Sequence, residues 1–313
     1  MKFIDLFAWI WGIKIWFENA WFKCVFSNDF DKNAQITFDA NFLNSKIILW
    51  DIQKIPTDII PDFDVLCGGF PCQPFSVAGY RQWFKDENGR GNLFFDIIRI
   101  LKDKKPKAFL LENVKNLKNH DKGNTIKVIY SELEKLWYKV TDKVMNSMEY
   151  GNLPQNRERI YIVGFLDEEV FNRFSFPEKI PLIKSIHDCL EESEVDDKYY
   201  YNNKPLYEKL SEDVVKKDTV YQWRRKYVRE NKNWVCPTLT ANMGMWWHNV
   251  PIVLNGKWIR KLTPRECANF QGFPKNYILP NIADSHLYKQ FGNSVSIPVI
   301  ERIAKNMNLA LTK

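Results

Sequence analysis

Three short motifs carry side chains that together suit covalent attack on an electron-poor heterocycle. Cys72 lies in the run Gly-Gly-Phe-Pro-Cys-Gln-Pro-Phe-Ser, whose prolines fix a turn around the thiol. Glu112 ends an apolar stretch and is followed by Asn-Val, while Arg157 and Arg159 lie further on in Gln-Asn-Arg-Glu-Arg. A thiolate adds to such a ring more easily when an acid supplies a proton and a guanidinium stabilises the charge that develops.

On these motifs the chain resembles the DNA cytosine-5 methyltransferases of bacterial restriction-modification systems. A lone Pro-Cys is weak evidence, because most intracellular cysteines are small buried hydrophobes. Here six motifs follow one another in the family's order, from Phe-Ile-Asp-Leu-Phe at 3–7 to Phe-Gly-Asn-Ser-Val at 291–295. The resemblance implies that a methyl group passes from S-adenosylmethionine to C5 of a cytosine flipped out of a specific DNA sequence.

The same resemblance implies a role for each catalytic candidate. Cys72 would add to C6 of cytosine, which turns C5 into a nucleophile towards a methyl sulfonium. Glu112 would hold a proton at N3, and Arg159 would bind the ring oxygen with Arg157 supporting the same site.

Composition sets the broad class. The chain has 313 residues, and its formal charge of +7 comes from 45 basic and 38 acidic residues, which permits a polyanionic partner without proving one. Six scattered cysteines form no CxxC pair and only four histidines occur, so we expect no disulfide framework and no metal site. No apolar run approaches the ~18 residues that span a bilayer. We expect a soluble cytoplasmic protein without a membrane anchor.

Apolar runs alternate with helix-like stretches through the first half of the chain. This alternation predicts an α/β fold with a doubly wound, mostly parallel, Rossmann-like sheet. We expect residues 1–174 to form the catalytic and cofactor-binding domain, 175–258 a target-recognition domain, and 259–313 to return to the catalytic domain. Strands are predicted at 2–6, 24–29, 65–67, 108–111 and 160–164, with helices at 12–19, 93–101, 125–136, after the capping sequence at 261–267, and from 295 onward.

The predicted cofactor site lies beyond the carboxyl ends of the first strands, where open α/β sheets bind their ligands. Asp29 could accept hydrogen bonds from both ribose hydroxyls. Without the motif context, an acid beside Asp31 is more often a solvated side chain or a helix cap, but the place of Asp29 after the second strand favours a ligand. Phe7 and Phe30 could enclose the adenosine. The resemblance adds Asp51 and Ile52 near the adenine, Asn293 and Val295 near the methionine part, and further contacts from Ile10, Gly12, Pro71 and Leu93.

Tryptophan stands where the family has glycine. Trp9 and Trp11 occupy the first loop, where the backbone must approach the cofactor closely. One cause would explain all of these tryptophans: a UGA codon that the source organism reads as glycine but that is translated here as tryptophan. The alternative is that the chain is the product of a decayed gene. Restoring 11 positions would raise glycine from 13 residues to 24, about 8% and near the usual ~7%. The other nine positions are Trp16, Trp21, Trp50, Trp83, Trp137, Trp234, Trp246, Trp247 and Trp258.

Several residues are candidates for contact with duplex DNA. The polar loop at 76–91, with Arg81, could close over a flipped base, although an ordinary surface loop has the same composition. Arg224 and Arg225 belong to a basic cluster that is either a phosphate-binding site or a solvated helix face. The resemblance adds Gln73, Ser76, Thr238 and Thr240. We expect a monomer that acts on double-stranded DNA, with a cognate restriction endonuclease as a possible partner.

Three other functions are compatible with parts of the sequence. An RNA cytosine-5 methyltransferase would use the same chemistry, but the substantial segment between Arg159 and Thr263 favours duplex DNA. A catalytically inactive nucleic-acid-binding relative would fit the tryptophans at 9 and 11. A nicotinamide-dependent oxidoreductase is disfavoured because the first loop lacks the full GxGxxG pattern.

Overall fold

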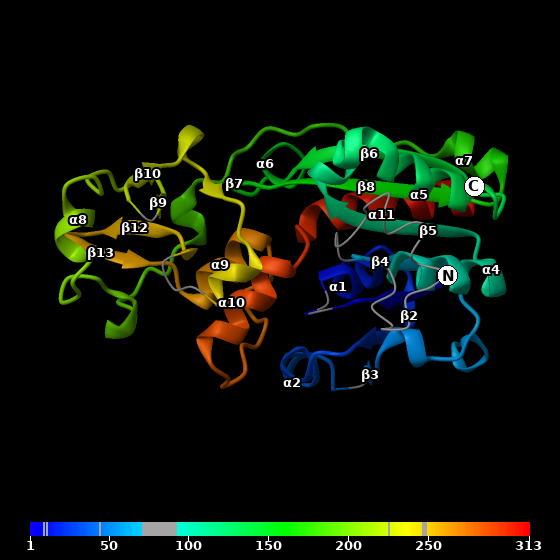
Figure 1. The fold of residues 1–313 in the computed structure, drawn as a ribbon, viewed down its shortest axis with the longest axis horizontal. Coiled ribbons are helices and arrows are strands. Elements are labelled where there is room, and N and C mark those ends of the chain that lie inside the picture. The colour runs from blue at the N-terminus through cyan, green and yellow to red at the C-terminus, as the bar shows by residue number, and fades with distance from the viewer. Residues whose placement is uncertain (9, 11, 44, 71–92, 225, 246–248) are drawn as a thin grey trace. The chain divides into compact units, whose positions relative to one another are not determined.

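The computed structural model describes residues 1–313 except 9, 11, 44, 71–92, 225 and 246–248 (Figure 1). By their contacts the residues form two compact units. The first comprises 1–145, 158–177 and 300–313, and the second comprises 146–157 and 178–299. Residues 259–299 therefore group with the second unit, whereas the sequence predicts a return to the first from 259; the return begins at 300, inside the last helix.

A seven-stranded sheet forms the centre of the first unit, with strand order β3-β2-β1-β4-β5-β8-β6. Its strands are β1 (Lys2–Leu6), β2 (Lys23–Asp29), β3 (Ile48–Leu49), β4 (Val65–Gly68), β5 (Ala108–Val114), β6 (Lys139–Asn146) and β8 (Glu158–Phe165). The helices are α1 (Gly12–Asn19), α2 (Lys32–Asn41), α4 (Leu93–Lys104), α5 (Asn124–Glu134), α7 (Glu168–Arg173) and α11 (Ile297–Thr312), which begins in the second unit.

The pairing confirms a doubly wound, mostly parallel sheet. β1 pairs in parallel with β2 on one side and β4 on the other, and β4 pairs in parallel with β5. The predicted strand at 160–164 exists as β8, but it runs antiparallel to β5. Because the chain order reverses between β1 and β4, the carboxyl ends of these strands mark the place where such folds bind ligands.

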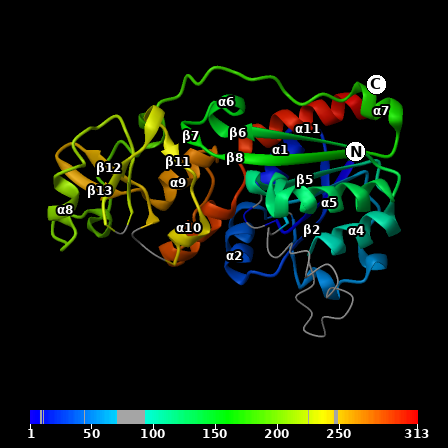
Figure 2. The same ribbon diagram turned by 45° about the horizontal axis from the view of Figure 1, so that its top comes forward.

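Alternate residues of β1 face the two layers of helices that cover the sheet. Ile4 belongs to the buried cluster that includes Phe94 of α4 and Ile129 of α5. Phe3 points the other way and packs on Phe17 of α1, with ring centroids 5.1 Å apart. Figure 2 shows the result, with α1 and α11 along one face of the sheet and α4 and α5 along the other.

The second unit contains a four-stranded sheet in the order β10-β9-β12-β13 and a parallel pair, β7 with β11. Its own core gathers Tyr201, Leu210, Tyr221 and Ile259. The predicted capping sequence is confirmed at Thr263, which forms a capping box with Glu266. The elements are α6 (Ser147–Tyr150), β7 (Gln155–Asn156), α8 (Tyr207–Ser211), β9 (Tyr221–Trp223), β10 (Val228–Glu230), β11 (Cys236–Pro237), β12 (Ile252–Asn255), β13 (Trp258–Lys261), α9 (Pro264–Gln271) and α10 (Asp284–Asn293).

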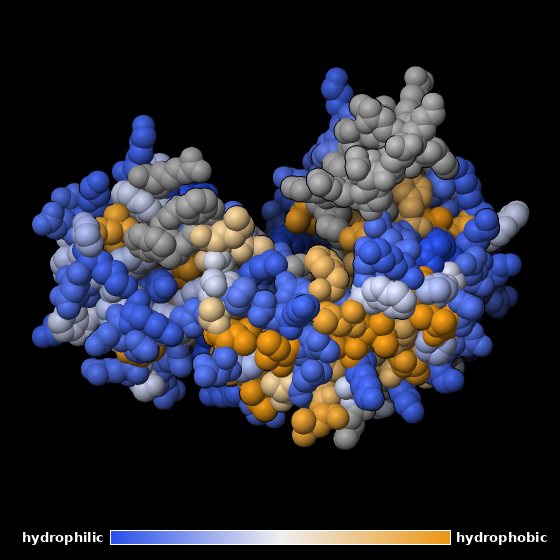
Figure 3. Space-filling model, turned by 60° about the horizontal axis from the view of Figure 1, so that its bottom comes forward, coloured by the Kyte–Doolittle hydropathy of each residue, from blue (hydrophilic) through white to orange (hydrophobic). Residues whose placement is uncertain are grey.

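Apolar side chains reach the surface of the first unit. Ile36, Leu43 and Ile48 are exposed there, and Figure 3 shows apolar side chains gathered on part of the surface among hydrophilic ones.

No helix of the described ranges is long and apolar enough to cross a membrane. Within the same ranges no group of three or more His, Cys, Asp or Glu residues is arranged to hold a metal ion.

Candidate active site

Glu112 and Arg159 form an ion pair on neighbouring strands. In the antiparallel ladder of β5 and β8, Glu112 lies opposite Tyr161 and Val114 lies opposite Arg159, which places the glutamate and the arginine on one face as diagonal neighbours. Nε of Arg159 lies 3.1 Å from Oε1 of Glu112. The side chains are 12% and 11% exposed, so the pair is shielded yet reachable from solvent.

The chain that leads to Cys72 is fixed beside this pair. Gly68 ends β4 in register with Leu111, so Gly69 lies next to Glu112, and a methyl group at Gly69 would lie 3.6 Å from Oε2 of Glu112. The side-chain amide of Asn113 donates a 2.9 Å hydrogen bond to the carbonyl of Phe70. The Glu-Asn-Val motif thus acts twice on the segment before Cys72: the carboxylate of Glu112 lies beside Gly69, and the side chain of Asn113 holds Phe70.

Several predicted site residues lie outside the described residues. They are Pro71, Cys72, Gln73, Ser76, Arg81 and Arg225, together with Trp9 and Trp11 of the first loop. The last described residue before Cys72 is Phe70, which is buried in the core of the first unit.

Arg157, which the sequence predicts to support the site at the ring oxygen, is held by backbone carbonyls. Its guanidinium is buried in the second unit and donates to the carbonyls of Leu239 at 2.8 Å, Gly292 at 3.3 Å and Ser294 at 2.5 Å. These partners lie far apart in the sequence, so Arg157 ties three segments together. These bonds give Arg157 a structural role, and its support of the substrate site stays a prediction.

One of the segments tied by Arg157 carries two predicted cofactor residues, Asn293 and Val295. Asn293 ends α10 and is partly buried, and Val295 is buried. Gly292 lies against the backbone of Thr240, where an added Cβ would come within 2.2 Å of the carbonyl carbon. The segment is held in place by backbone packing and by Arg157 together.

The predicted nucleoside site of the first unit lies at the carboxyl ends of β1, β2 and β3. Register places Leu6 beside Asn28, and the amide of Ala8 donates to the carbonyl of Asn28 at 3.1 Å. Phe7 lies in this turn with φ of 57°, a left-handed conformation that aromatic residues rarely adopt. Strained backbone of this kind is concentrated at functional sites.

Asp29 holds the turn that follows β2. Its Oδ1 accepts the amides of Phe30 at 2.7 Å and Asp31 at 2.8 Å, whereas Asp31 is the residue that caps α2. The ring of Phe30 is exposed. A carboxylate that can accept hydrogen bonds from ribose hydroxyls and aromatic rings that can stack on a base lie at one sheet edge, and this combination fits a nucleoside.

The adenine candidates Asp51 and Ile52 follow β3. Asp51 caps a short 3-10 helix through the amide of Gln53, and Ile52 is buried in the same core cluster as the partly buried Phe7 and Leu93. Ile10 and Gly12 are buried at the start of α1. The first-unit candidates are thus gathered around one end of the sheet.

Two residues of this region were not predicted. Arg99 of α4 donates to the carbonyls of Ile52 at 2.9 Å and Ile55 at 3.0 Å and so fixes the segment after Asp51. Asp5 of β1 is fully buried, and neither carboxylate oxygen has a hydrogen-bond partner among the described residues. Burial raises the pKa of Asp5, Lys14 opposes this rise, and Asp29 adds to it. In the sequence, Asp5 could have been singled out by its position in the Phe-Ile-Asp-Leu-Phe motif.

The basic cluster of the second unit lies on a hairpin, not on a helix. β9 and β10 pair antiparallel, and the amide of Arg224 donates to the carbonyl of Tyr227 across the turn. Arg224 is exposed. Thr238 binds the carbonyl of Asn156 at 2.6 Å through its hydroxyl, while Thr240 is exposed beside Gly292.

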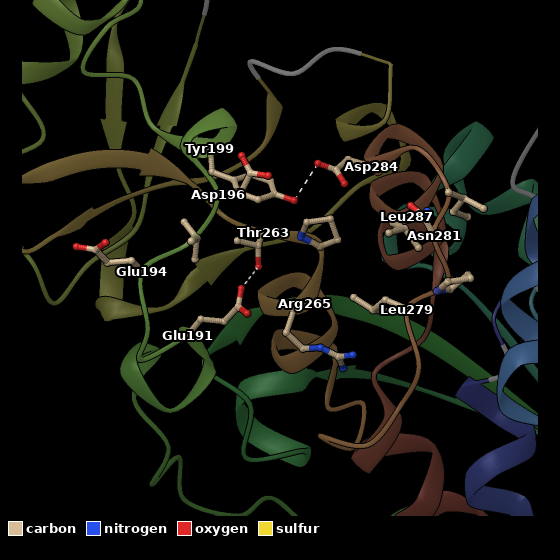
Figure 4. Close-up of a pocket in the computed structure, with 14 residues that line it drawn as sticks. Glu191, Glu194, Asp196, Tyr199, Thr263, Arg265, Leu279, Asn281, Asp284 and Leu287 are labelled. Carbon is tan, nitrogen blue, oxygen red and sulfur yellow. Dashed lines mark hydrogen bonds between the residues drawn. The ribbon is translucent and has the colours of Figure 1, made fainter.

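A hollow of about 500 Å³ in the second unit does not suit nucleic acid (Figure 4). Glu191, Glu194, Asp196 and Asp284 line it, and the hydroxyl of Thr263 donates to Glu191 at 2.5 Å. A wall rich in carboxylates repels a phosphate backbone. The hollow is therefore not the candidate active site.

The comparisons with known proteins specify the class of protein to which this fold and the Glu112–Arg159 pair belong. The model of the C-5 cytosine-specific DNA methylase family matches residues 1–309. Type II methyltransferase M.Bsp6I from Bacillus sp. (strain RFL6) is 53% identical over 311 residues, which cover 98% of both chains. Type II methyltransferase M.HhaI from Haemophilus parahaemolyticus is 38% identical and covers 99% of this chain and 95% of its own.

Solved structures share the fold at lower identity. The crystal structure of S. pombe Dnmt2 methyltransferase has a TM-score of 0.77 and 19% identity, and the match covers 100% of both chains. The chain belongs to the C-5 cytosine-specific DNA methylases. It is a DNA (cytosine-5-)-methyltransferase of the restriction-modification type.

Proposed function

We propose that Cys72, Glu112 and Arg159 carry out the methylation of a flipped-out cytosine. The observation that carries this assignment is the Glu112–Arg159 pair beside Gly69, with Asn113 holding Phe70 two residues before Cys72. In this arrangement the acid and the guanidinium meet one edge of a ring while the thiol approaches C6. S-adenosylmethionine supplies the methyl group.

The steps follow from the side chains. The Cys72 thiolate forms a bond to C6 while Glu112 holds a proton at N3 and Arg159 binds O2, so that C5 becomes nucleophilic. C5 gains the methyl group as the carbon–sulfur bond of the sulfonium breaks and leaves a neutral thioether. Loss of the C5 proton to solvent then restores the double bond and expels the thiolate from C6. Both Cys72 and the ring system are regenerated.

The other cysteines are poor nucleophiles, which supports the choice of Cys72. Burial raises the pKa of Cys67, Cys236 and Cys267 well above the usual range, and it raises that of Cys24 to about 11 and of Cys189 to about 12. A thiol with such a pKa holds very little thiolate near neutral pH. These five are all the cysteines besides Cys72.

The cofactor and DNA contacts are also part of the proposal. Phe7, Asp29 and Phe30 would hold the nucleoside, with Asp51 and Ile52 at the adenine and the segment with Asn293 and Val295 at the methionine part. The second unit, through Arg224 and the neighbourhood of Thr238 and Thr240, would read the target sequence of duplex DNA. We place the enzyme in the cytoplasm as a monomer, paired with a restriction endonuclease for the same site.

A trapping experiment tests the assignment. DNA with 5-fluorocytosine at the target should form a stable covalent complex, because fluorine cannot leave as a proton does. Cys72→Ala should abolish both trapping and methylation and retain DNA binding. Cys24→Ala is the matched control and should trap normally; a Cys72→Ala enzyme that still methylates would remove the mechanism.

A further inference from the structure

Helix α1 ends in a backbone motif that normally requires glycine. The amide of Phe22 donates to the carbonyl of Phe17 at 3.0 Å, and the amide of Trp21 donates to that of Glu18 at 3.1 Å. These two bonds define a Schellman motif in which residue 21 is the left-handed C′ position. The accompanying apolar contact is present, with the rings of Phe17 and Phe22 5.0 Å apart. Trp21 has φ of 65°.

Helix α5 ends in the same motif. The amide of Tyr138 donates to the carbonyl of Leu133 at 3.4 Å, and the amide of Trp137 donates to that of Glu134 at 2.9 Å. Trp137 therefore occupies the C′ position, and its φ is 70°. Leu133 and Tyr138 supply the apolar contact inside the core cluster.

Helix α9 shows which residue this motif takes elsewhere in the chain. The amide of Phe273 donates to the carbonyl of Ala268, and that of Gly272 donates to Asn269, with the same spacing as in α1 and α5. Gly272, at φ of 85°, is the C′ residue. Three helices thus share one ending, and two of the three carry the bulkiest side chain where the third carries none.

Burial of the indole side chains does not offset the cost of this backbone conformation. Trp21 is 74% exposed and Trp137 is 83% exposed. Exposure alone does not show that tryptophan is the wrong residue at these positions, because Ile36 and Leu43 of the same unit are also exposed. The deciding observation is the left-handed φ within a Schellman ending, the position that glycine usually occupies because a Cβ atom there crowds the following carbonyl.

We infer that positions 21 and 137 are glycine in the protein that its source organism makes, and that the same codon explains tryptophan at both. The hydrogen bonds and φ values at these positions indicate glycine independently of the family's glycine pattern. Trp234 also has a left-handed φ, of 50°, and is 67% exposed.

The geometry also separates these positions from others. Trp258 lies in strand β13 and Trp50 lies in the turn after β3, and neither has a positive φ. Trp16 lies within helix α1. The backbone at these three positions makes no demand for glycine, so they supply controls.

The decisive measurement is the mass of two tryptic peptides of the protein isolated from its source. They cover residues 15–23 and 136–139 and contain positions 21 and 137. We expect glycine at both positions. Tryptophan at either one overturns the inference.

A stability series tests the physical reason in the chain as written. Trp21→Gly and Trp137→Gly should each raise the melting temperature by about 2–4 °C relative to Trp21→Ala and Trp137→Ala. Alanine removes the indole and keeps Cβ, so this difference isolates the backbone effect. Trp258→Gly should be no more stable than Trp258→Ala, because glycine weakens a strand. If glycine fails to exceed alanine at 21 and 137, the backbone argument fails and the inference with it.

Discussion

Two arginine–carboxylate pairs in this enzyme differ in how completely their partners are satisfied. In the second unit Arg260 binds Glu266 through two hydrogen bonds of 2.8 and 2.6 Å, and both side chains are 0% exposed. Glu266 also accepts the amide of Thr263. In the first unit Arg159 meets Glu112 through one contact of 3.1 Å, and Oε1 of Glu112 has no hydrogen bond among the described residues.

The Arg260–Glu266 pair therefore stabilises the fold, whereas the Arg159–Glu112 pair retains capacity to bind a ligand. A fully buried carboxylate with bidentate pairing has no capacity left for a ligand. Glu112 keeps capacity to exchange hydrogen bonds with a ring nitrogen, and the guanidinium of Arg159 lies beside it. Arg157, only two residues before Arg159, resembles the first kind because backbone carbonyls surround it.

The largest effect should come from breaking the buried pair. Arg260→Ala leaves the Glu266 carboxylate buried without its counter-ion and should lower the free energy of unfolding by about 3–5 kcal/mol. Urea unfolding followed by circular dichroism measures it. Lys305→Ala, which removes a partly exposed i,i+4 ion pair with Glu301, is the control and should cost at most about 1 kcal/mol. Similar losses for both variants would contradict the comparison.

Glu112→Gln should sharpen the comparison from the other side. We expect turnover to fall by about 10²-fold or more, because the amide cannot deliver a proton to N3. Unfolding should shift far less than for Arg260→Ala. Steady-state methylation with labelled cofactor gives the rate, and Glu158→Gln, on the exposed pair with Lys115, is the control. An equal loss of cofactor affinity would instead give Glu112 a structural role.

Arg157→Lys tests whether Arg157 belongs with the structural pair. Lysine keeps the charge but cannot reach three carbonyls with one planar fork, so we expect a loss of about 1.5–3 kcal/mol in unfolding free energy. The turnover per folded enzyme should change less than in Arg159→Lys. A variant of normal stability with abolished turnover would return Arg157 to the catalytic group.

The smallest effect should appear as a slope with pH. Because burial raises the pKa of Asp5 in the folded protein, the unfolded chain gives up this proton first as the pH rises. Stability due to Asp5 is therefore full below its ordinary pKa and declines as the pH rises through the raised value, by at most about 1.4 kcal/mol per pH unit. Asp5→Asn lacks this titration. Its stability relative to the natural side chain, from unfolding at several pH values, should improve with rising pH; a constant difference would contradict the assignment.

Much of the fold could be predicted because apolar periodicity reports local structure. The helix at 12–19 and the strand at 2–6 have the predicted bounds. The direction of β8 could not be predicted, since an apolar run has the same pattern in a parallel and an antiparallel strand. The helix face suggested for Arg224 is wrong for a related reason, because a short hairpin with exposed basic residues lacks clear alternation.

The site was predicted in part. Glu112 and Arg159 lie together as their motifs suggest, but the partners of Arg157 stand up to 137 residues away in the sequence. Arg99 was missed for the same reason, since its carbonyl partners lie 44 and 47 residues earlier. Long-range bonds from side chains to carbonyls leave no pattern in a single sequence, because every residue type offers the same carbonyl.

The first unit is assembled from chain segments that leave the ribosome at very different times. Ile300, Ile303 and Met307 of α11 are fully buried, and Arg173 donates to the carbonyl of Ala310. During synthesis, the side of the nascent sheet that will receive α11 must wait while all of 178–299 is made. Nascent chains with exposed apolar surface aggregate readily. A stalled or shortened translation product should therefore depend on chaperones even though it contains Cys72, Glu112 and Arg159.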